Sequence, residues 1–257
     1  MRITLLLLLF VYACYALPAK DSKRGLANAD SAFSADIKKA NTSTSLVSWQ
    51  YNWGSSASDT LAKSGIQFIP MQWGTSGIDN FSTKVKSQGA QIILGFNEPD
   101  LASQSNIDAA SAAALWKKYI DPLAASGVRL GAPAVTSGPG GQVWLAAFLA
   151  ACSGCTIDFI PFHWYGTGID NFSNYVSSMH ARFPNYPLWV TEFASTSSDT
   201  TEVANFMNSA IQHLDSLDWI ERYSWFAYNR QQDGSFWNLL DENGSLNNMG
   251  KTYVNGA

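Results

Sequence analysis

From residue 24 onward, short apolar runs rich in β-branched and aromatic residues alternate with longer amphipathic segments. This alternation is typical of repeated βα units, in which parallel strands are connected by helices. The runs predict eight strands, at Gly25–Asn28, Leu46–Gln50, Ile66–Pro70, Gln91–Gly95, Val128–Ala132, Ile157–Phe162, Leu188–Thr191 and Tyr223–Ala227.

The segments between these runs carry Ala, Leu and polar residues at helical spacing, for example in Ile107–Ala125 and Glu202–Leu217. Eight βα units predict an α/β fold of one domain, a single (β/α)8 or TIM barrel with the helices as its outer ring. An open doubly wound sheet is the alternative. It is disfavoured because no glycine-rich phosphate loop follows the first predicted strand.

Composition narrows the classes of ligand. Of the 257 residues 46% are hydrophobic and 14% are charged, which suits one large core. The net charge of −4 provides no basic stripe for nucleic acid or for an anionic membrane, so we expect neither as a partner. Ten Trp and ten Tyr exceed what core filling alone accounts for, and flat rings also stack on sugars. We expect a monomer that binds a neutral ligand.

The N-terminal end has the features of an export signal. Arg2 is followed by the apolar run Ile3–Val11 and then by small residues up to Ala16, which predicts a signal peptide over residues 1–16. The apolar run is too short to span a bilayer. We therefore expect a secreted protein, either extracellular or associated with a cell wall.

A dibasic pair, Lys23-Arg24, follows the predicted signal peptide. It suggests a short propeptide over residues 17–24, with the catalytic domain over residues 25–257. The alternative is that residues 23–27 begin the first strand. Both hold if cleavage leaves residues 25–27 intact.

Cysteines and sequons fit an exported chain. Cys14 leaves with the predicted signal peptide, and export favours a local disulfide between Cys152 and Cys155 over a redox pair. No second cysteine pair or histidine cluster completes a metal site, so we expect no metal and no other cofactor. Four Asn-x-Ser/Thr sequons predict a glycoprotein, at Asn41, Asn80, Asn171 and Asn243.

Two glutamates lie at the mouth ends of long apolar strands, Glu98 in Ile92-Ile-Leu-Gly-Phe-Asn-Glu-Pro-Asp100 and Glu192 in Leu188-Trp-Val-Thr-Glu-Phe193. They fall at the ends of predicted strands four and seven, where a barrel builds its active site. A carboxylate in such a place costs folding free energy unless it has partners, which favours function over structure. The alternative is two buried glutamates in structural hydrogen bonds.

Two carboxyl groups across a barrel mouth suit the hydrolysis of a glycosidic bond, with Glu98 as general acid/base and Glu192 as nucleophile. Retention of configuration requires them about 5–5.5 Å apart. Other polar and aromatic residues near the strand ends are candidates for substrate binding: Asn97, Trp49, Trp53, Gln72, Trp73, His163, Trp164, Tyr165, Trp225 and Tyr228. For His163, a structural role is the alternative.

The motif Asn97-Glu98-Pro99, with a second glutamate ending strand seven, resembles the retaining glycoside hydrolases of clan A. The chain is more narrowly similar to glycoside hydrolase family 128 and the related fungal alkali-sensitive-linkage proteins of the cell wall. The similarity extends over Lys23-Arg-Gly-Leu26, Ser48-Trp-Gln-Tyr-Asn-Trp-Gly54, Phe68-Ile-Pro-Met-Gln-Trp-Gly74, Leu94-Gly-Phe-Asn-Glu-Pro-Asp100, Gly131-Ala-Pro-Ala134, Phe162-His-Trp-Tyr165, Trp189-Val-Thr-Glu-Phe193 and Leu240-Asp-Glu-Asn-Gly244.

The resemblance implies β-1,3-glucan or its oligosaccharides as the ligand. It further implies that Trp225 floors the subsite of the reacting sugar, and that His163 and Tyr165 orient Glu192 or a sugar hydroxyl. We expect an endo-acting β-1,3-glucanase. The alternative is a glucan-binding or wall-remodelling protein with weak or exo-type hydrolysis. A serine hydrolase is disfavoured because there is no Gly-x-Ser-x-Gly motif.

Overall fold

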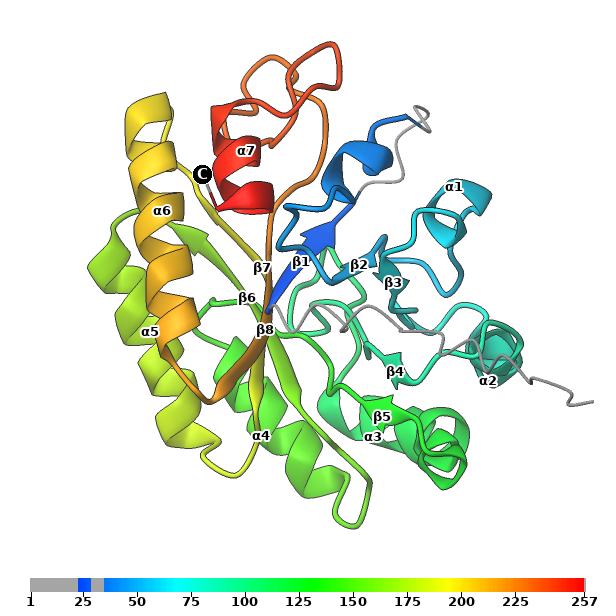
Figure 1. The fold of residues 1–257 in the computed structure, drawn as a ribbon. Helices are drawn as coiled ribbons and strands as arrows, with labels where there is room; N and C mark the ends of the chain where they lie inside the picture. The colour runs from blue at the N-terminus through cyan, green and yellow to red at the C-terminus, as the bar shows by residue number, and fades with distance from the viewer. Residues whose placement is uncertain (1–22, 29–34, 257) are drawn as a thin grey trace, which may run out of the picture.

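The computed structural model describes residues 23–28 and 35–256. The predicted signal peptide and residues 17–22 of the predicted propeptide lie outside the described residues. Each predicted strand has a counterpart in the fold (Figure 1): β1 (Arg24–Ala27), β2 (Trp49–Tyr51), β3 (Gln67–Phe68), β4 (Ile92–Ile93), β5 (Arg129–Leu130), β6 (Ile160–Gly166), β7 (Leu188–Ser195) and β8 (Ile220–Trp225).

The strands are parallel and follow one another around a ring. Six form one sheet in the order β3-β2-β1-β8-β7-β6, and β4 pairs with β5 in a second sheet. Isolated parallel bridges join the two sheets, Met71 with Leu94 on one side and Gly131 with Phe159 on the other. The predicted (β/α)8 barrel is confirmed.

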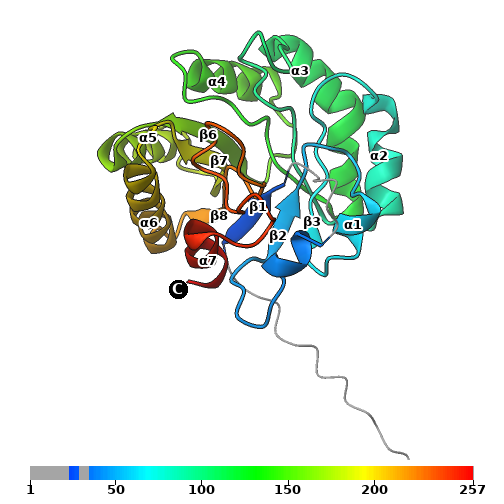
Figure 2. The same cartoon turned by 90° about the horizontal axis from the view of Figure 1, so that it is seen from above.

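Helices surround this ring on the outside when it is seen from above (Figure 2). The predicted helix over Ile107–Ala125 is interrupted: α3 ends at Leu115, a π-turn follows, and a 3-10 turn begins at Asp121 with Pro122 in its first turn. Proline has no N–H for the helical ladder, which accounts for the 3-10 turn that begins at Asp121. The α-helices are α1 (Asp59–Ala62), α2 (Ile78–Ser87), α3 (Ala109–Leu115), α4 (Gly141–Ala151), α5 (Ile169–Arg182), α6 (Thr200–Ser216) and α7 (Asn248–Asn255).

Strands β6 and β7 extend further than predicted, to Gly166 and Ser195. Their register shifts after Phe162, so that His163 pairs with Glu192. Parallel strands that are buried on both faces appear in the sequence as continuous apolar runs, so the sequence does not mark where strand pairing stops. The consequence is that both polar residues lie within the sheet instead of in loops beyond it.

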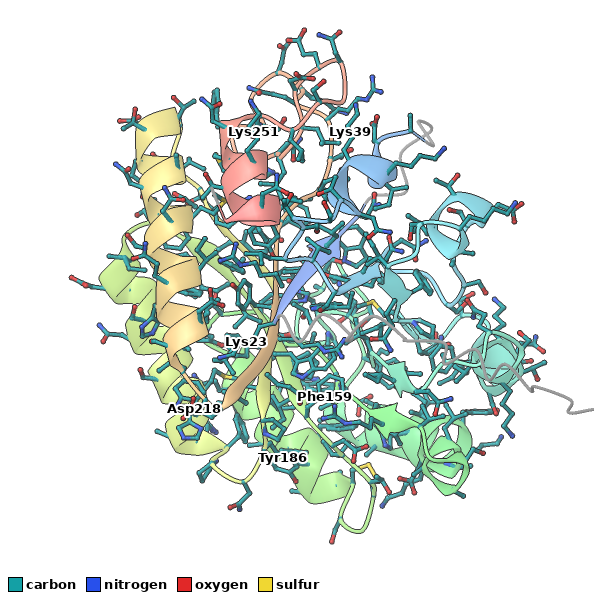
Figure 3. All side chains as sticks on the ribbon, in the orientation of Figure 1. Lys23, Lys39, Phe159, Tyr186, Asp218 and Lys251 are labelled. Carbon is teal, nitrogen blue, oxygen red and sulfur yellow. A yellow bond between two sulfur atoms is a disulfide. The ribbon has the colours of Figure 1, made fainter. Side chains whose placement is uncertain are left out.

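Large rings fill the barrel interior. Phe159 stacks on Trp189 with centroids 3.9 Å apart, and Trp49 packs against Trp189 at 5.3 Å. Gly25 and Gly131 make room for these rings, because a Cβ there would lie 2.0 Å from Trp49 and 2.5 Å from Phe159. In Figure 3 the labelled Phe159 lies in the lower half of the view, as does Lys23 next to the start of β1.

The first described residues, Lys23 and Arg24, are tied to the end of α6. Lys23 donates to the carbonyl oxygens of Leu214, Asp215 and Leu217, and Arg24 forms an ion pair with Asp215. The dibasic pair is thus part of the barrel, and residues 24–27 do form the first strand. Where the mature chain begins stays a prediction.

Two further features concern the outside of the barrel. Cys152 and Cys155 form a disulfide directly after α4, as predicted. Within residues 23–28 and 35–256, no helix combines the length and the apolar character needed to cross a membrane.

Candidate active site

A cavity of about 510 Å³ opens where the strands end. Both predicted catalytic glutamates line it, although they come from opposite parts of the chain. Among the described residues, the lining consists of Trp53, Trp73, Asn97, Glu98, Gln104, Tyr165, Glu192 and Phe226.

Glu98 lies directly after a bridge between Asn97 and Ala134, which continues the β4–β5 pairing. Its backbone has φ 43°, in the left-handed region that non-glycine residues rarely adopt. Such strain is typical of functional sites. The side chain is only 9% exposed, and it is therefore held in the cavity wall.

His163 lies between the two glutamates. Its Nδ1 is 2.8 Å from Oε1 of Glu98 and 3.4 Å from Oε2 of Glu192, and its side chain is fully buried. One carboxylate oxygen of Glu98 lies within 4.8 Å of one of Glu192. The two carboxyl groups therefore face each other at short range across the mouth.

Glu192 has hydrogen-bond donors on both oxygens. Nε1 of Trp53 donates to Oε1 at 2.6 Å, and the hydroxyl of Tyr165 donates to Oε2 at 2.6 Å. The hydroxyl of Tyr51 lies 3.4 Å from Oε1. Donors of this kind stabilise the ionised carboxylate that a nucleophile needs.

The electrostatics of the site favour a charged His163. Burial alone would lower the pKa of His163, but the charges of Glu192 and Glu98 and the hydrogen bond to Glu98 raise that pKa above its ordinary value. Burial and the charge of Glu192 raise the pKa of Tyr165 far above the ordinary value, and that of Tyr51 likewise. Both phenols therefore stay protonated and remain donors.

Among the described residues, Glu98, His163 and Glu192 form a group whose ligand atoms, all within 4.8 Å of one another, could hold a metal ion. His163 lies between the two carboxylates and contacts both of them, which accounts for the short distances in this group. The absence of a cofactor stays a prediction.

The structure brings together five of the ten predicted substrate-binding residues. Trp53, Trp73, Asn97 and Tyr165 line the cavity, and Trp73 is 39% exposed. His163 contacts both glutamates behind the cavity surface.

Three predicted aromatic residues do not lie in the cavity. Trp49 is fully buried at the start of β2 and donates to the carbonyl of Lys23 at the far end of the barrel. Trp164 stacks on Phe206 of α6 and Trp225 packs against Phe193, both on the outer side of the sheet. Side chains alternate along a strand, so the neighbouring residue faces inward instead.

The remaining two predicted residues hold loops. Gln72 donates to the carbonyls of Gly74 and Ser76, and the hydroxyl of Tyr228 donates to the carbonyl of Asp36. Both side chains are almost fully buried. They shape the mouth without lining it.

Two cavity residues were missed by the sequence analysis. Phe226 follows the predicted Trp225 directly, and the alternation along β8 was the signal that could have identified it. Gln104 lies in the loop after Glu98, with its Oε1 3.4 Å from Nδ2 of Asn97. No sequence signal distinguishes it from other loop residues.

A (β/α)8 barrel with two facing carboxylates at its mouth defines the class of the glycoside hydrolases. The family described as glycosyl hydrolase catalytic core matches residues 25–253. Among solved structures, the chain is 35% identical to an exo-β-1,3-glucanase of glycoside hydrolase family 128, subgroup III, from Blastomyces gilchristii. That match covers 92% of this chain and 99% of the other, with a TM-score of 0.78. The chain belongs to the glycosyl hydrolase catalytic core family and, within it, to glycoside hydrolase family 128.

Two other relatives are informative. An endo-β-1,3-glucanase of subgroup II from Sorangium cellulosum is 32% identical over 90% of this chain and 97% of the other, with a TM-score of 0.78. Alkali-sensitive linkage protein 1 of Schizosaccharomyces pombe is 37% identical over 81% of this chain. The chain spans 40% of the length of that curated relative.

Proposed function

We propose that this protein is a retaining β-1,3-glucanase, with Glu98 as acid/base and Glu192 as nucleophile. The observation that carries the proposal is the separation of the carboxylates, whose nearest oxygens lie within 4.8 Å. Retaining enzymes keep their carboxyl groups about 5–5.5 Å apart, whereas inverting enzymes need about 6.5–9.5 Å for a water molecule. The short separation favours double displacement.

In the first step, an oxygen of Glu192 bonds to the anomeric carbon while the bond to the leaving oxygen breaks. Glu98 donates its proton to that leaving oxygen. In the second step, Glu98 takes a proton from water, whose oxygen bonds to the anomeric carbon and displaces Glu192. Asn97 lies beside Glu98, with its Oδ1 buried and free of any hydrogen bond from the described residues, and is a candidate to bind a sugar hydroxyl.

The substrate class is proposed from the relatives and from the cavity. Structures of the subgroup I endo-β-1,3-glucanase from Amycolatopsis mediterranei contain laminarihexaose and laminaritriose. The lining formed by the described residues here has four aromatic rings and no Lys or Arg. Rings of this kind suit the flat faces of a neutral glucan. A lining of described residues without Lys or Arg disfavours an acidic glycan.

We further propose endo action, export through the signal peptide over residues 1–16, and a location outside the cell or in a wall. The relatives include both endo- and exo-acting enzymes, so the product pattern is the test that separates the two modes.

The test incubates the protein with linear β-1,3-glucan and with β-1,4-glucan, and resolves the products by length over time. Mixed short β-1,3-oligosaccharides are expected from the wild type, with the anomeric configuration retained in an early NMR spectrum. The Glu192→Gln variant should bind glucan without cleaving it. Inverted product, or full activity of Glu192→Gln, would contradict the mechanism. Glucan binding without any products would favour a wall glucan-binding protein.

A further inference from the structure

The two oxygens of Glu192 are surrounded by four potential donors, two at each oxygen. Near Oε1 are Nε1 of Trp53 at 2.6 Å and the hydroxyl of Tyr51 at 3.4 Å. Near Oε2 are the hydroxyl of Tyr165 at 2.6 Å and Nδ1 of His163 at 3.4 Å. Each oxygen thus has one short contact and one long contact.

The protons of the two distant groups are already in use. The hydroxyl of Tyr51 donates to the carbonyl of Thr191 at 2.8 Å, and a phenol carries a single proton. Nδ1 of His163 lies closer to Glu98, at 2.8 Å. Among the described residues, Oε1 of Glu192 is therefore held by Trp53 and Oε2 by Tyr165.

Trp53 is fixed in place more firmly than an ordinary loop residue. Its φ of 59° lies in the left-handed region, which costs a tryptophan free energy that the surroundings must supply. Its ring packs edge-on against Tyr51 at 5.2 Å and against Phe226 at 5.9 Å. The strained backbone and the two rings together aim the indole N–H at the carboxylate.

The position of His163 shows which oxygen of Glu192 faces the acid/base. Its Nδ1 contacts Oε1 of Glu98 and Oε2 of Glu192, so Oε2 lies on the Glu98 side of the cavity. A sugar bound between the two glutamates would meet Oε2 first. Oε1 is then the oxygen that does not attack.

We infer that Trp53 is a positioning residue for the nucleophile, an inference that rests on the proposed function. Its indole N–H holds Oε1 while Oε2 forms the bond to the anomeric carbon. The same N–H then donates to Oε1 as the carbonyl oxygen of the glycosyl ester. Because an indole N–H does not titrate, this donor keeps its proton throughout the reaction.

The test compares Trp53→Phe, which keeps a ring but removes the donor, with the wild type. Trp144→Phe is the matched control, because Trp144 lies on the outer helix α4 and its indole N–H donates to the carbonyl of Ile107 at 2.8 Å. The measurements are kcat and KM on β-1,3-glucan, and the rate of covalent labelling by 2-deoxy-2-fluoro-β-laminaribiosyl fluoride, read by intact mass. Thermal unfolding is recorded for all three proteins.

Trp53→Phe should lower both kcat and the labelling rate by about 10- to 100-fold, the effect of losing one hydrogen bond to a charged group. KM should change little, and Trp144→Phe should match the wild type. Unchanged labelling, or a change confined to KM, would show that Trp53 only packs or forms a wall of the cavity. Failure to label the wild type would overturn the proposed nucleophile itself.

A second variant covers the case in which Trp53→Phe does not fold. Trp53→His retains a ring N–H, so the inference requires it to label faster than Trp53→Ala at pH 8, where the imidazole is neutral. Equal rates would overturn the inference.

Discussion

Nδ1 of His163 lies 2.8 Å from Oε1 of Glu98, and the same nitrogen approaches Oε2 of Glu192 to 3.4 Å. One histidine nitrogen thus connects the two carboxylates proposed to divide the chemistry. The charges of both carboxylates raise the pKa of His163 above its ordinary value.

The roles of the glutamates can be separated by the stereochemistry of rescue. Glu98→Ala and Glu192→Ala should both lose activity on an aryl β-laminaribioside, and azide should restore product formation in both. Azide attacking the covalent intermediate of Glu98→Ala gives the β-azide. Azide in place of the missing Glu192 gives the α-azide. NMR of the products measures the anomer, and the opposite pattern would exchange the two roles.

His163 should make stability depend on pH in a defined direction. Its pKa is raised in the folded protein, so its contribution is fully present below the unfolded value of about 6.5 and is lost as pH rises through the folded value. The free energy of unfolding of the wild type should exceed that of His163→Gln by more at pH 5.5 than at pH 9, in denaturant titrations.

His213 supplies the control with the opposite sign. Burial lowers the pKa of His213, so its contribution is present above the unfolded value and is lost as pH falls. The difference between the wild type and His213→Gln should therefore shrink toward acid. The same trend in both variants would contradict the environment described for His163.

Arg129 of β5 and Glu221 of β8 form a two-bond ion pair although their strands are not neighbours. Burial would raise the pKa of Glu221, but the bonds from Arg129 and Trp189 outweigh it and lower that pKa. Glu221→Gln should cost about 1 kcal/mol of unfolding free energy at pH 7, because the pair is partly exposed to solvent. This difference should fade as pH falls through the lowered pKa, when both proteins carry a neutral side chain.

Gly25→Ala should destabilise the barrel by about 3 kcal/mol, since the new methyl group would meet the buried ring of Trp49. Adding Trp49→Leu should recover part of the loss, because contacting sites are coupled. Gly140→Ala is the control, as a Cβ there meets nothing within 4 Å. Additive losses in the double variant would show that the ring is not the cause.

Asn41 should carry no glycan even if the other sequons do. Its Nδ2 donates to the carbonyl of Ser64 at 2.7 Å, and a glycan attached to this nitrogen would compete with that hydrogen bond. Asn243, exposed in a turn, has space. Enzymatic deglycosylation in ¹⁸O water followed by peptide mass spectrometry measures occupancy at each asparagine.

The sequence predicted the order of all eight strands because buried parallel strands are marked by apolar β-branched runs. The sequence did not show where the strands end: β4 and β5 are only two residues long each, whereas β7 runs on to Ser195. Pairing across the barrel sets these limits, and a single strand does not encode its neighbour's register.

The site residues that could be predicted differ from the others in how unusual their residue type is at the end of a buried strand. Glu98 and Glu192 are recognisable because a carboxylate after an apolar run is unusual. Aromatic residues are common in both the core and the cavity, so the sequence did not show that Phe226 faces inward while Trp225 faces α6. A shift of one residue along the strand decides whether a ring faces the cavity or the outer helices.

The rings of Trp49, Phe159 and Trp189 are buried in one apolar cluster inside the barrel. Trp53 and Phe226, which line the cavity, pack against this cluster, so the cavity wall is continuous with the packed interior. Under the proposed mechanism, we expect the hydrolytic water to enter through the same mouth as the glucan. Departure of the leaving chain then becomes a precondition for the second half of the reaction, and a sugar that stays in its place would be positioned to accept the glycosyl group instead.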